Sequence, residues 1–254
     1  MMTTATINAA RELLERRNHT TKFPRLAADI RPETLEDALA IQAEMVAQHT
    51  ASVGGWKCLL PPSEDRLIVG PIFSDAIYQG DTLKLNEDDG VARVEPEIVF
   101  ILGKDLPAKD TDYTESEIDA AIDKTHMAFE LMQSRYAKDA DQSFPEALAD
   151  ILLNQGLYIG NEIDKADAYK AATIDIKITQ ASGEQTFEGK HPNPLPAQPV
   201  HWLINYMTKR GVSFTAGQAI ITGSYAGIVR LAFDEPTVVE YAGLGRTEVT
   251  LERR

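Results

Sequence analysis

The sequence predicts a mixed α+β domain built on curved sheet and preceded by a helical region. Two amphipathic patterns with helical spacing lie ahead of Val53, and short apolar segments separated by turns follow it. Strand patterns outnumber helical ones after Val53, and few alternate with helices one for one. That order is typical of α+β proteins and not of doubly wound sheets. We therefore expect a helical region over residues 1–52 and a larger sheet domain over residues 53–254.

The two N-terminal helices have recognisable starts. Apolar residues recur at helical spacing over residues 5–17, with Thr3 and Thr4 as alternative N-caps. Similar spacing over residues 34–49 follows Pro32, which suits the start of a helix. These two helices make up the expected helical region.

The remaining elements are short. The expected strands cover residues 67–78, 91–102, 126–132, 171–179, 218–223, 238–241 and 247–251. The expected helices cover residues 115–124, 144–153 and 199–209, and Gly211 ends the last of them.

The composition argues against several classes of protein. A formal net charge of −14 disfavours binding to nucleic acid or to anionic membranes, since both need a basic surface. The single cysteine, Cys58, rules out an intrachain disulfide and a cysteine zinc cluster. No apolar signal region and no run of about 18 apolar residues is present. We therefore expect a cytoplasmic protein.

Two glutamates mark the most informative segment, VEPEIVF. Residues two apart on a strand point to the same side, so Glu95 and Glu97 present their carboxylates together. Two adjacent anions repel each other unless a cation lies between them. Pro96 cannot donate to a neighbouring strand, so we expect an edge or a bulge here. The alternative interpretation is a pair of solvated glutamates at a strand end.

A third carboxylate favours the cation. Glu130 lies within MAFELM, an apolar segment that is expected to be a buried strand. A lone buried carboxylate is costly unless it is paired or bound to metal. Together with Glu95 and Glu97 it would form an oxygen-rich site suited to Mg²⁺ or Mn²⁺.

Four segments carry a resemblance to a known family. VEPEIVF, FELMQSR, GGWKC and ITGS together resemble the fumarylacetoacetate hydrolase superfamily, in particular its hydratase and decarboxylase branch. The resemblance implies that Glu95, Glu97 and Glu130 bind Mg²⁺ or Mn²⁺ and that Lys57 is the active-site lysine. It also implies a mixed β-roll of the family's C-terminal type behind a helical region. A role in aromatic catabolism, a homo-oligomer and an enzyme partner from the same pathway are further expectations.

The sequence departs from the family pattern at three places. Gln133 stands where an acid usually follows the third ligand, and Ser74 replaces one of two acids beside Asp75. The family's A-D-N-A-S stretch reads ADILLN over residues 149–154. These departures bear on the substrate more than on the metal.

Lys57 and the Gly223–Ser224 pair complete the candidate site. A lysine between Trp56 and an apolar segment is expected to be partly buried, which lowers the pKa of a lysine toward acid–base range. The alternative is a lysine that only packs its stem and keeps its charge in water. Gly223 and Ser224 follow an apolar strand and offer an N–H and a hydroxyl to a substrate carboxylate, or they form a simple turn.

The predicted function is a divalent-metal-dependent hydratase of 2-hydroxy-2,4-dienoates, a hydro-lyase acting on a small 2-oxo acid. Asp75 or Asp150 is expected to orient the attacking water. The alternatives are an oxo-diacid decarboxylase, an acylpyruvate-type C–C hydrolase and a non-catalytic member that binds a small acid. The hydrolase needs a histidine and an acid near the site, and no residues clearly supply that pair.

Overall fold

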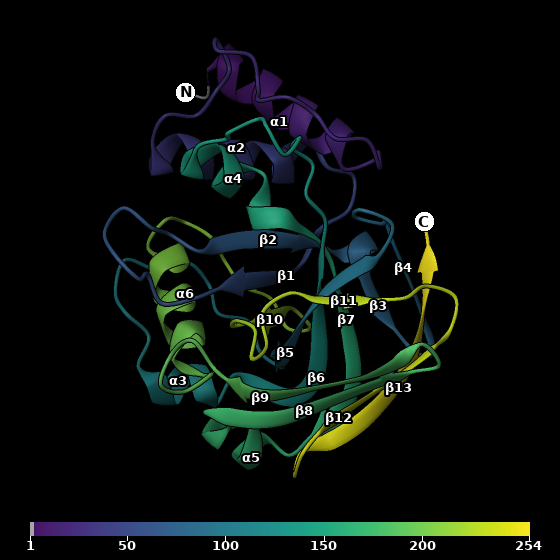
Figure 1. Ribbon diagram of the computed structural model, residues 1–254. Coiled ribbons are helices and arrows are strands. Elements are labelled where there is room, and N and C mark those ends of the chain that lie inside the picture. The colour runs from purple at the N-terminus through teal and green to yellow at the C-terminus, as the bar shows by residue number, and fades with distance from the viewer. Residues whose placement is uncertain (1–2) are drawn as a thin grey trace.

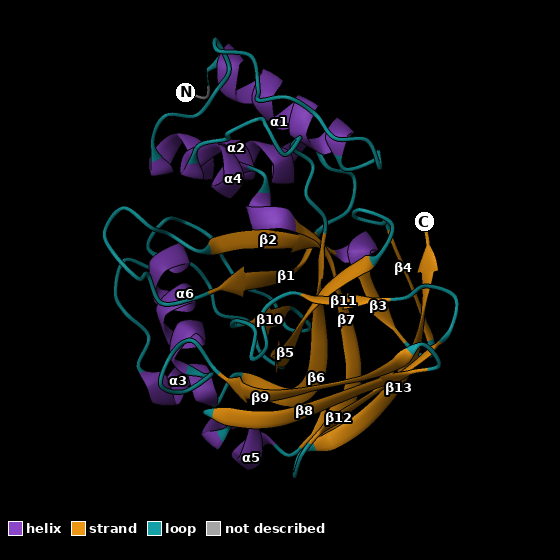
Figure 2. Cartoon of the chain, in the orientation of Figure 1, coloured by secondary structure: helices purple, strands orange, loops and turns teal. Residues whose placement is uncertain are grey.

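The computed structural model describes residues 3–254 and has the expected mixed α+β architecture. Helices α1 (Thr4–Arg16), α2 (Leu35–Gln48) and α4 (Phe144–Ala149) gather at one end of the molecule, and the two sheets with the remaining helices beside them make up the rest (Figures 1 and 2). Within the described residues, none of the helices is long and apolar enough to span a bilayer. The helices and the two sheets confirm the α+β class, while the finer description as a β-roll stays a prediction.

Both N-terminal helices begin where the sequence indicates. Helix α1 runs over Thr4–Arg16 with Thr3 as its N-cap. Helix α2 runs over Leu35–Gln48, and the side chains of Thr34 and Asp37 form a reciprocal capping box. Side chains of both helices belong to the same hydrophobic cluster as those of the sheets. Because helices and sheets share this cluster, no separate core marks a boundary at residue 52, and the division there stays a prediction.

The larger sheet carries the candidate site. Its strand order is β2-β1-β10-β5-β6-β7-β3, and β11 also pairs with β5. Parallel pairs join β1 to β10 and β3 to β7, and the other pairs are antiparallel. The strands are β1 Val53–Cys58, β2 Val69–Phe73, β3 Ile77–Gln79, β5 Ala92–Leu102, β6 Ile122–Met132, β7 Asn154–Ile163, β10 Ala219–Ile221 and β11 Val229–Leu231.

The smaller sheet has the strand order β4-β13-β12-β8-β9. Its strands are β4 Thr82–Leu85, β8 Thr173–Gln180, β9 Gly183–Lys190, β12 Pro236–Tyr241 and β13 Gly245–Arg253. Strands β1, β4, β7, β9 and β11 have no counterpart among the strand ranges predicted from the sequence. Strand β9 is almost wholly exposed and β7 is buried on both faces over most of its length, so neither alternates.

Two predicted helices are shorter than expected. Helix α3 ends at Asp119, and β6 begins at Ile122, inside the segment predicted as helix. Helix α4 covers Phe144–Ala149, and the chain then enters the single turn η2, Ile151–Leu153. The remaining helices are η1 Ser74–Ala76, α5 Lys165–Lys170 and α6 Gln198–Thr208.

Pro96 does not lie at an outer edge of the sheet, which corrects the sequence prediction. It pairs with Phe129 of β6 on one side of β5. On the other side, β11 pairs only with residues 92–94 and β10 only with residues 99–101. Pro96 faces the gap between these two short strands, where the backbone N–H of Tyr225 donates to its carbonyl over 3.0 Å. The missing N–H of proline is tolerated because no strand is paired at that point.

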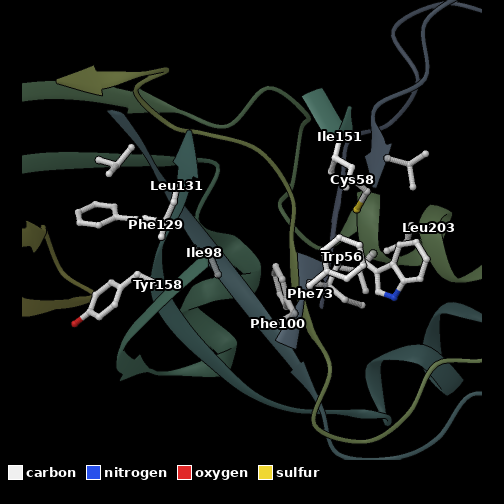
Figure 3. Close-up of a cluster of buried hydrophobic side chains, with 14 of the residues drawn as sticks. Trp56, Cys58, Phe73, Ile98, Phe100, Phe129, Leu131, Ile151, Tyr158 and Leu203 are labelled. Atoms are coloured by element: carbon white, nitrogen blue, oxygen red, sulfur yellow. The ribbon is translucent and has the colours of Figure 1, made fainter. Parts of the chain in front are cut away.

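Apolar side chains cover both faces of β5. Ile98 and Phe100 belong to the large core, which also includes Phe129 and Tyr158 (Figure 3). Val99 belongs to a second, smaller cluster with residues of β2, β6, β7 and β10. Alternation places Glu95 and Glu97 on the same face as Val99. The carboxylates therefore lie beyond one end of an apolar layer.

Candidate functional site

The strand register brings the three glutamates together. Glu95 of β5 is the direct partner of Glu130 of β6, and Glu97 lies two residues along β5 on the same face. One carboxylate oxygen from each of the three lies within 4.8 Å of the others. The arrangement predicted from the sequence is therefore present in the structure.

The electrostatics of this cluster fit a divalent cation. Glu97 and Glu130 are each 1% exposed. Burial, and then the charge of Glu130, raises the pKa of Glu95 to about 7. Burial and the two neighbouring glutamates raise the pKa of Glu97 well above its usual range, although the N–H of Gly223 donates to it over 2.6 Å. Three converging carboxylates are unfavourable on their own, and a bound cation would offset both effects.

Lys57 is the one basic side chain, among the described residues, that lines this cavity. It lies on β1, where parallel pairing sets it beside Ile221 of β10. Its Nζ is 2.6 Å from Oε1 of Glu130 and 3.2 Å from the carbonyl oxygen of Leu152. The lysine is 6% exposed, so it lies inside the cavity and does not extend into solvent. This burial excludes the alternative of a lysine that keeps its head group in water.

Asn154 is part of the site, and the sequence analysis did not single it out. Its Nδ2 donates to Oε1 of Glu130 over 2.8 Å, the same oxygen that accepts from Lys57. Its Oδ1 is buried and has no hydrogen-bond partner within residues 3–254. Asn154 was considered only as part of the stretch that departs from the family pattern. Nothing local in that stretch indicates a contact with Glu130.

The turn before Asn154 has an unusual backbone. Ile151, Leu152 and Leu153 have φ angles of 58°, 48° and 70°. Left-handed conformations are costly for bulky and β-branched residues, and three in succession need strong support from packing. Ile151 supplies part of it, since its Cγ2 would lie 2.6 Å from a Cβ added to Gly70. The turn directs the carbonyl of Leu152 at Lys57.

The glutamates and Lys57 line a cavity of about 240 Å³. Gly223 and Ser224 also line it, as predicted. Gly223 has φ 116°, and an added Cβ there would lie 2.5 Å from a side-chain atom of Leu59, so only glycine fits. The hydroxyl of Ser224 donates to the carbonyls of Gly227 (3.1 Å) and Pro96 (3.4 Å). The other lining residues are Cys58, Leu59, Ile68, Pro192 and Gly227.

Asp75 and Asp150, expected to orient water, do not line this cavity. Asp75 follows β2 in η1, has a side chain that is 54% exposed, and lies 3.4 Å from Nε2 of His49. Asp150 caps α4 and is buried in an ion pair with Arg135, whose Nε is 2.8 Å from its carboxylate. Each aspartate already has a partner elsewhere, because the chain turns away from the cavity at both positions.

Two of the three departures from the family pattern, Gln133 and Ser74, also lie away from the cavity. Gln133 is fully buried; its Nε2 donates to the carbonyl of His19 and its Oε1 accepts from Asn86. Ser74 accepts a hydrogen bond from the hydroxyl of Ser52. The amide of Gln133 therefore completes a hydrogen-bond network of uncharged buried groups, and its contacts lie away from the three glutamates.

Known proteins resemble this chain along most of its length, although no family model matches it. It is 29% identical to 2-hydroxyhexa-2,4-dienoate hydratase of Comamonas testosteroni over 240 residues, 87% of this chain and 88% of that one. It is 25% identical to 2-oxo-hept-4-ene-1,7-dioate hydratase of Escherichia coli over 228 residues, covering 84% and 85% of the two chains.

Solved structures show the same fold. 4-Oxalocrotonate decarboxylase from Pseudomonas putida G7, complexed with magnesium and adipate, has a TM-score of 0.75, 18% identity and 99% coverage of both chains. A protein from Yersinia pestis assigned to the fumarylacetoacetate hydrolase family has a TM-score of 0.53 and 18% identity, covering 80% of this chain and 94% of its own. The predicted resemblance is therefore confirmed: the chain resembles hydratases in sequence, and it shares its fold with a decarboxylase and with a protein of the fumarylacetoacetate hydrolase family.

Proposed function

We propose that the protein is a divalent-metal-dependent hydratase that converts 2-hydroxy-2,4-dienoates to 4-hydroxy-2-oxo acids. The observation that carries the proposal is the contact of Lys57 with Glu130 inside a cavity lined by three carboxylates. The similarity to two dienoate and oxo-enoate hydratases supports the same reaction class. Glu95, Glu97 and Glu130 would hold Mg²⁺ or Mn²⁺, and magnesium is the ion named for the decarboxylase of similar fold.

The chain's own residues account for proton movement. A bound cation would chelate the substrate carboxylate and 2-oxygen and draw electron density from them. Lys57 is positioned to take the proton of the 2-hydroxyl group and return it to carbon 5, which yields the 2-oxo-3-enoate. Water then adds its hydroxyl to carbon 4 and its proton to carbon 3. The apolar wall of Leu59, Ile68 and Pro192 limits access of bulk water.

The shortage of free basic side chains near the cavity favours hydration over decarboxylation. A decarboxylase substrate carries a second carboxylate, which needs its own cationic partner in a dry cavity. Arg93 and Arg135 are each held by a buried aspartate, and Lys190 is exposed on β9. A neutral-tailed dienoate leaves no second anion unpaired beside Lys57.

An acylpyruvate-type C–C hydrolase needs a histidine–acid pair near its site. Among the described residues, no histidine lines the cavity of the glutamates. The structure does contain such a pair, His49 and Asp75, with a separation of 3.4 Å. Both residues line a different cavity, which shares no lining residue with that of the glutamates. A decarboxylase remains the second candidate, because solved structures of 4-oxalocrotonate decarboxylase cover 99% of this chain.

The test supplies Mg²⁺ with either 2-hydroxypenta-2,4-dienoate or 2-oxohexenedioate. We expect rapid loss of dienol absorbance and formation of 4-hydroxy-2-oxopentanoate, with slower release of CO₂ from the diacid. Faster CO₂ release from the diacid would reject the hydratase in favour of the decarboxylase. The cytoplasmic location, the homo-oligomer and the enzyme partner of the same pathway remain parts of this proposal.

A further inference from the structure

A second cavity lies between the N-terminal helices and the larger sheet. Its volume is about 510 Å³, within the range of small-molecule sites. It is separate from the cavity of the glutamates, since the two share no lining residue. Its basic lining residues are Arg11, Arg17, His49 and Arg254.

Arg17 is the central cation of this second cavity. No carboxylate within residues 3–254 lies within salt-bridge distance of it, and its Nη1 donates over 3.0 Å to the carbonyl of Asn154. Burial, and then the charge of Arg135, lowers the pKa of Arg17 to about 9. A guanidinium has five N–H donors, so most of its capacity is unused. Arg17 is partly buried and lines the cavity, so an anion bound there would accept charge-assisted hydrogen bonds from its unused N–H groups.

The acidic residues of the cavity are engaged with other partners. Glu15 contacts His19 over 3.2 Å, and Asp75 contacts His49 over 3.4 Å. The guanidinium of Arg254 donates to the hydroxyl of Tyr78, and no ion pair of Arg254 is found in the described part of the chain. With Arg11, Arg17 and Arg254 set against Glu15 and Asp75, the cavity keeps a net positive charge when His49 is neutral.

Apolar side chains form the rest of the wall. Leu14, Phe73, Ala76 and Tyr78 line the cavity, and the guanidinium of Arg17 lies 5.6 Å from the centre of the Phe73 ring. Inorganic phosphate would leave this wall uncovered, whereas an organic acid would cover it and present its carboxylate to Arg17. We propose that this cavity is a second binding site, for a small organic carboxylate, distinct from the cavity of the glutamates.

The test uses benzoate as the probe, with inorganic phosphate as the comparison. The full chain is first treated with EDTA and dialysed, so that no cation in the first cavity can hold the probe, and calorimetric titration then measures binding. We expect benzoate to bind and phosphate to bind more weakly or not at all. Arg17→Gln should weaken benzoate binding by about tenfold or more, as the loss of a charge-assisted hydrogen bond predicts.

Two further variants keep the outcome interpretable. Arg11→Gln changes an exposed residue of the same cavity and should also weaken binding, even if Arg17→Gln fails to fold. Arg230→Gln removes an exposed arginine on β11 outside the cavity and should bind benzoate as the native chain does. No benzoate binding by the native chain, equal binding by Arg17→Gln or Arg11→Gln, or a preference for phosphate would overturn the proposal. Failure of the dienoate assay would not affect these results, so the two proposals fail separately.

Discussion

The metal-free protein should become more stable when Glu95 is replaced by glutamine. The pKa of Glu95 is raised from 4.5 to about 7, mainly by burial and by the charge of Glu130. Between these pH values the folded state binds more protons than the unfolded state does. The free energy of unfolding therefore falls as the pH rises through this window. At about 1.4 kcal/mol per unit the upper limit of this loss is about 3 kcal/mol, and partial solvent exposure reduces it to about 1 to 3 kcal/mol.

Glu95→Gln removes the titrating group and should recover that stability above pH 7. For a chain of this size the gain corresponds to a rise in Tm of about 3 to 10 °C. The assay is thermal unfolding in EDTA at pH 5 and pH 8, with Glu188→Gln on the exposed strand β9 as the matched control. The native chain and Glu188→Gln should both lose stability between the two pH values, and Glu95→Gln should lose less.

Excess Mg²⁺ should make the native chain more stable than Glu95→Gln, which reverses their order of stability at pH 8 without metal. A ligand at a hundred times its Kd stabilises the folded state by about 2.7 kcal/mol, so excess Mg²⁺ should raise the Tm of the native chain by about 5 to 10 °C. Glu95→Gln should show little of this rise. A metal-free Glu95→Gln protein that is less stable than the native chain at pH 8, with its Mg²⁺ response intact, would refute the reasoning about repulsion within the cluster.

Four further outcomes follow from the contacts of residues in or near the candidate site. Lys57→Met should lower kcat by about a hundredfold or more while Mg²⁺ binding is retained, and near-normal turnover would show that the lysine only packs. Asn154→Ala removes a donor to Glu130 and should weaken Mg²⁺ affinity or activity by about 10- to 100-fold, measured by calorimetry and steady-state kinetics. Asp150→Asn breaks a buried ion pair and should cost about 3 to 5 kcal/mol of stability in urea unfolding. Asp75→Asn should change kcat by about twofold at most, since its side chain is exposed and lies outside the cavity.

The three glutamates of the candidate metal site are predictable from the sequence because their signal is local. Residues two apart on a strand share a face, and a glutamate within an apolar strand demands a partner. Both rules apply to single segments, so Glu95, Glu97 and Glu130 could be identified without knowledge of how the strands pair. The register of β5 and β6 then brings the three together.

The rest of the site depends on contacts that are distant in sequence. Asn154 reaches Glu130 across an irregularity between β6 and β7, where Leu131 pairs with Gly156 but Met132 pairs with Asn154. The left-handed turn before it is not encoded by glycine, so no sequence pattern indicates it. The position of Asp150 outside the cavity depends on its ion pair with Arg135, and no local pattern in the sequence indicates that contact.

Location of the cation tests the central claim most directly. Crystals of the native chain grown with Mn²⁺ would give an anomalous difference map that shows where the ion lies. The account predicts one strong peak bound by carboxylate oxygens of Glu95, Glu97 and Glu130, with no such peak in crystals of Glu97→Gln. A fully formed cavity without a peak, or a peak bound by other residues, would contradict it.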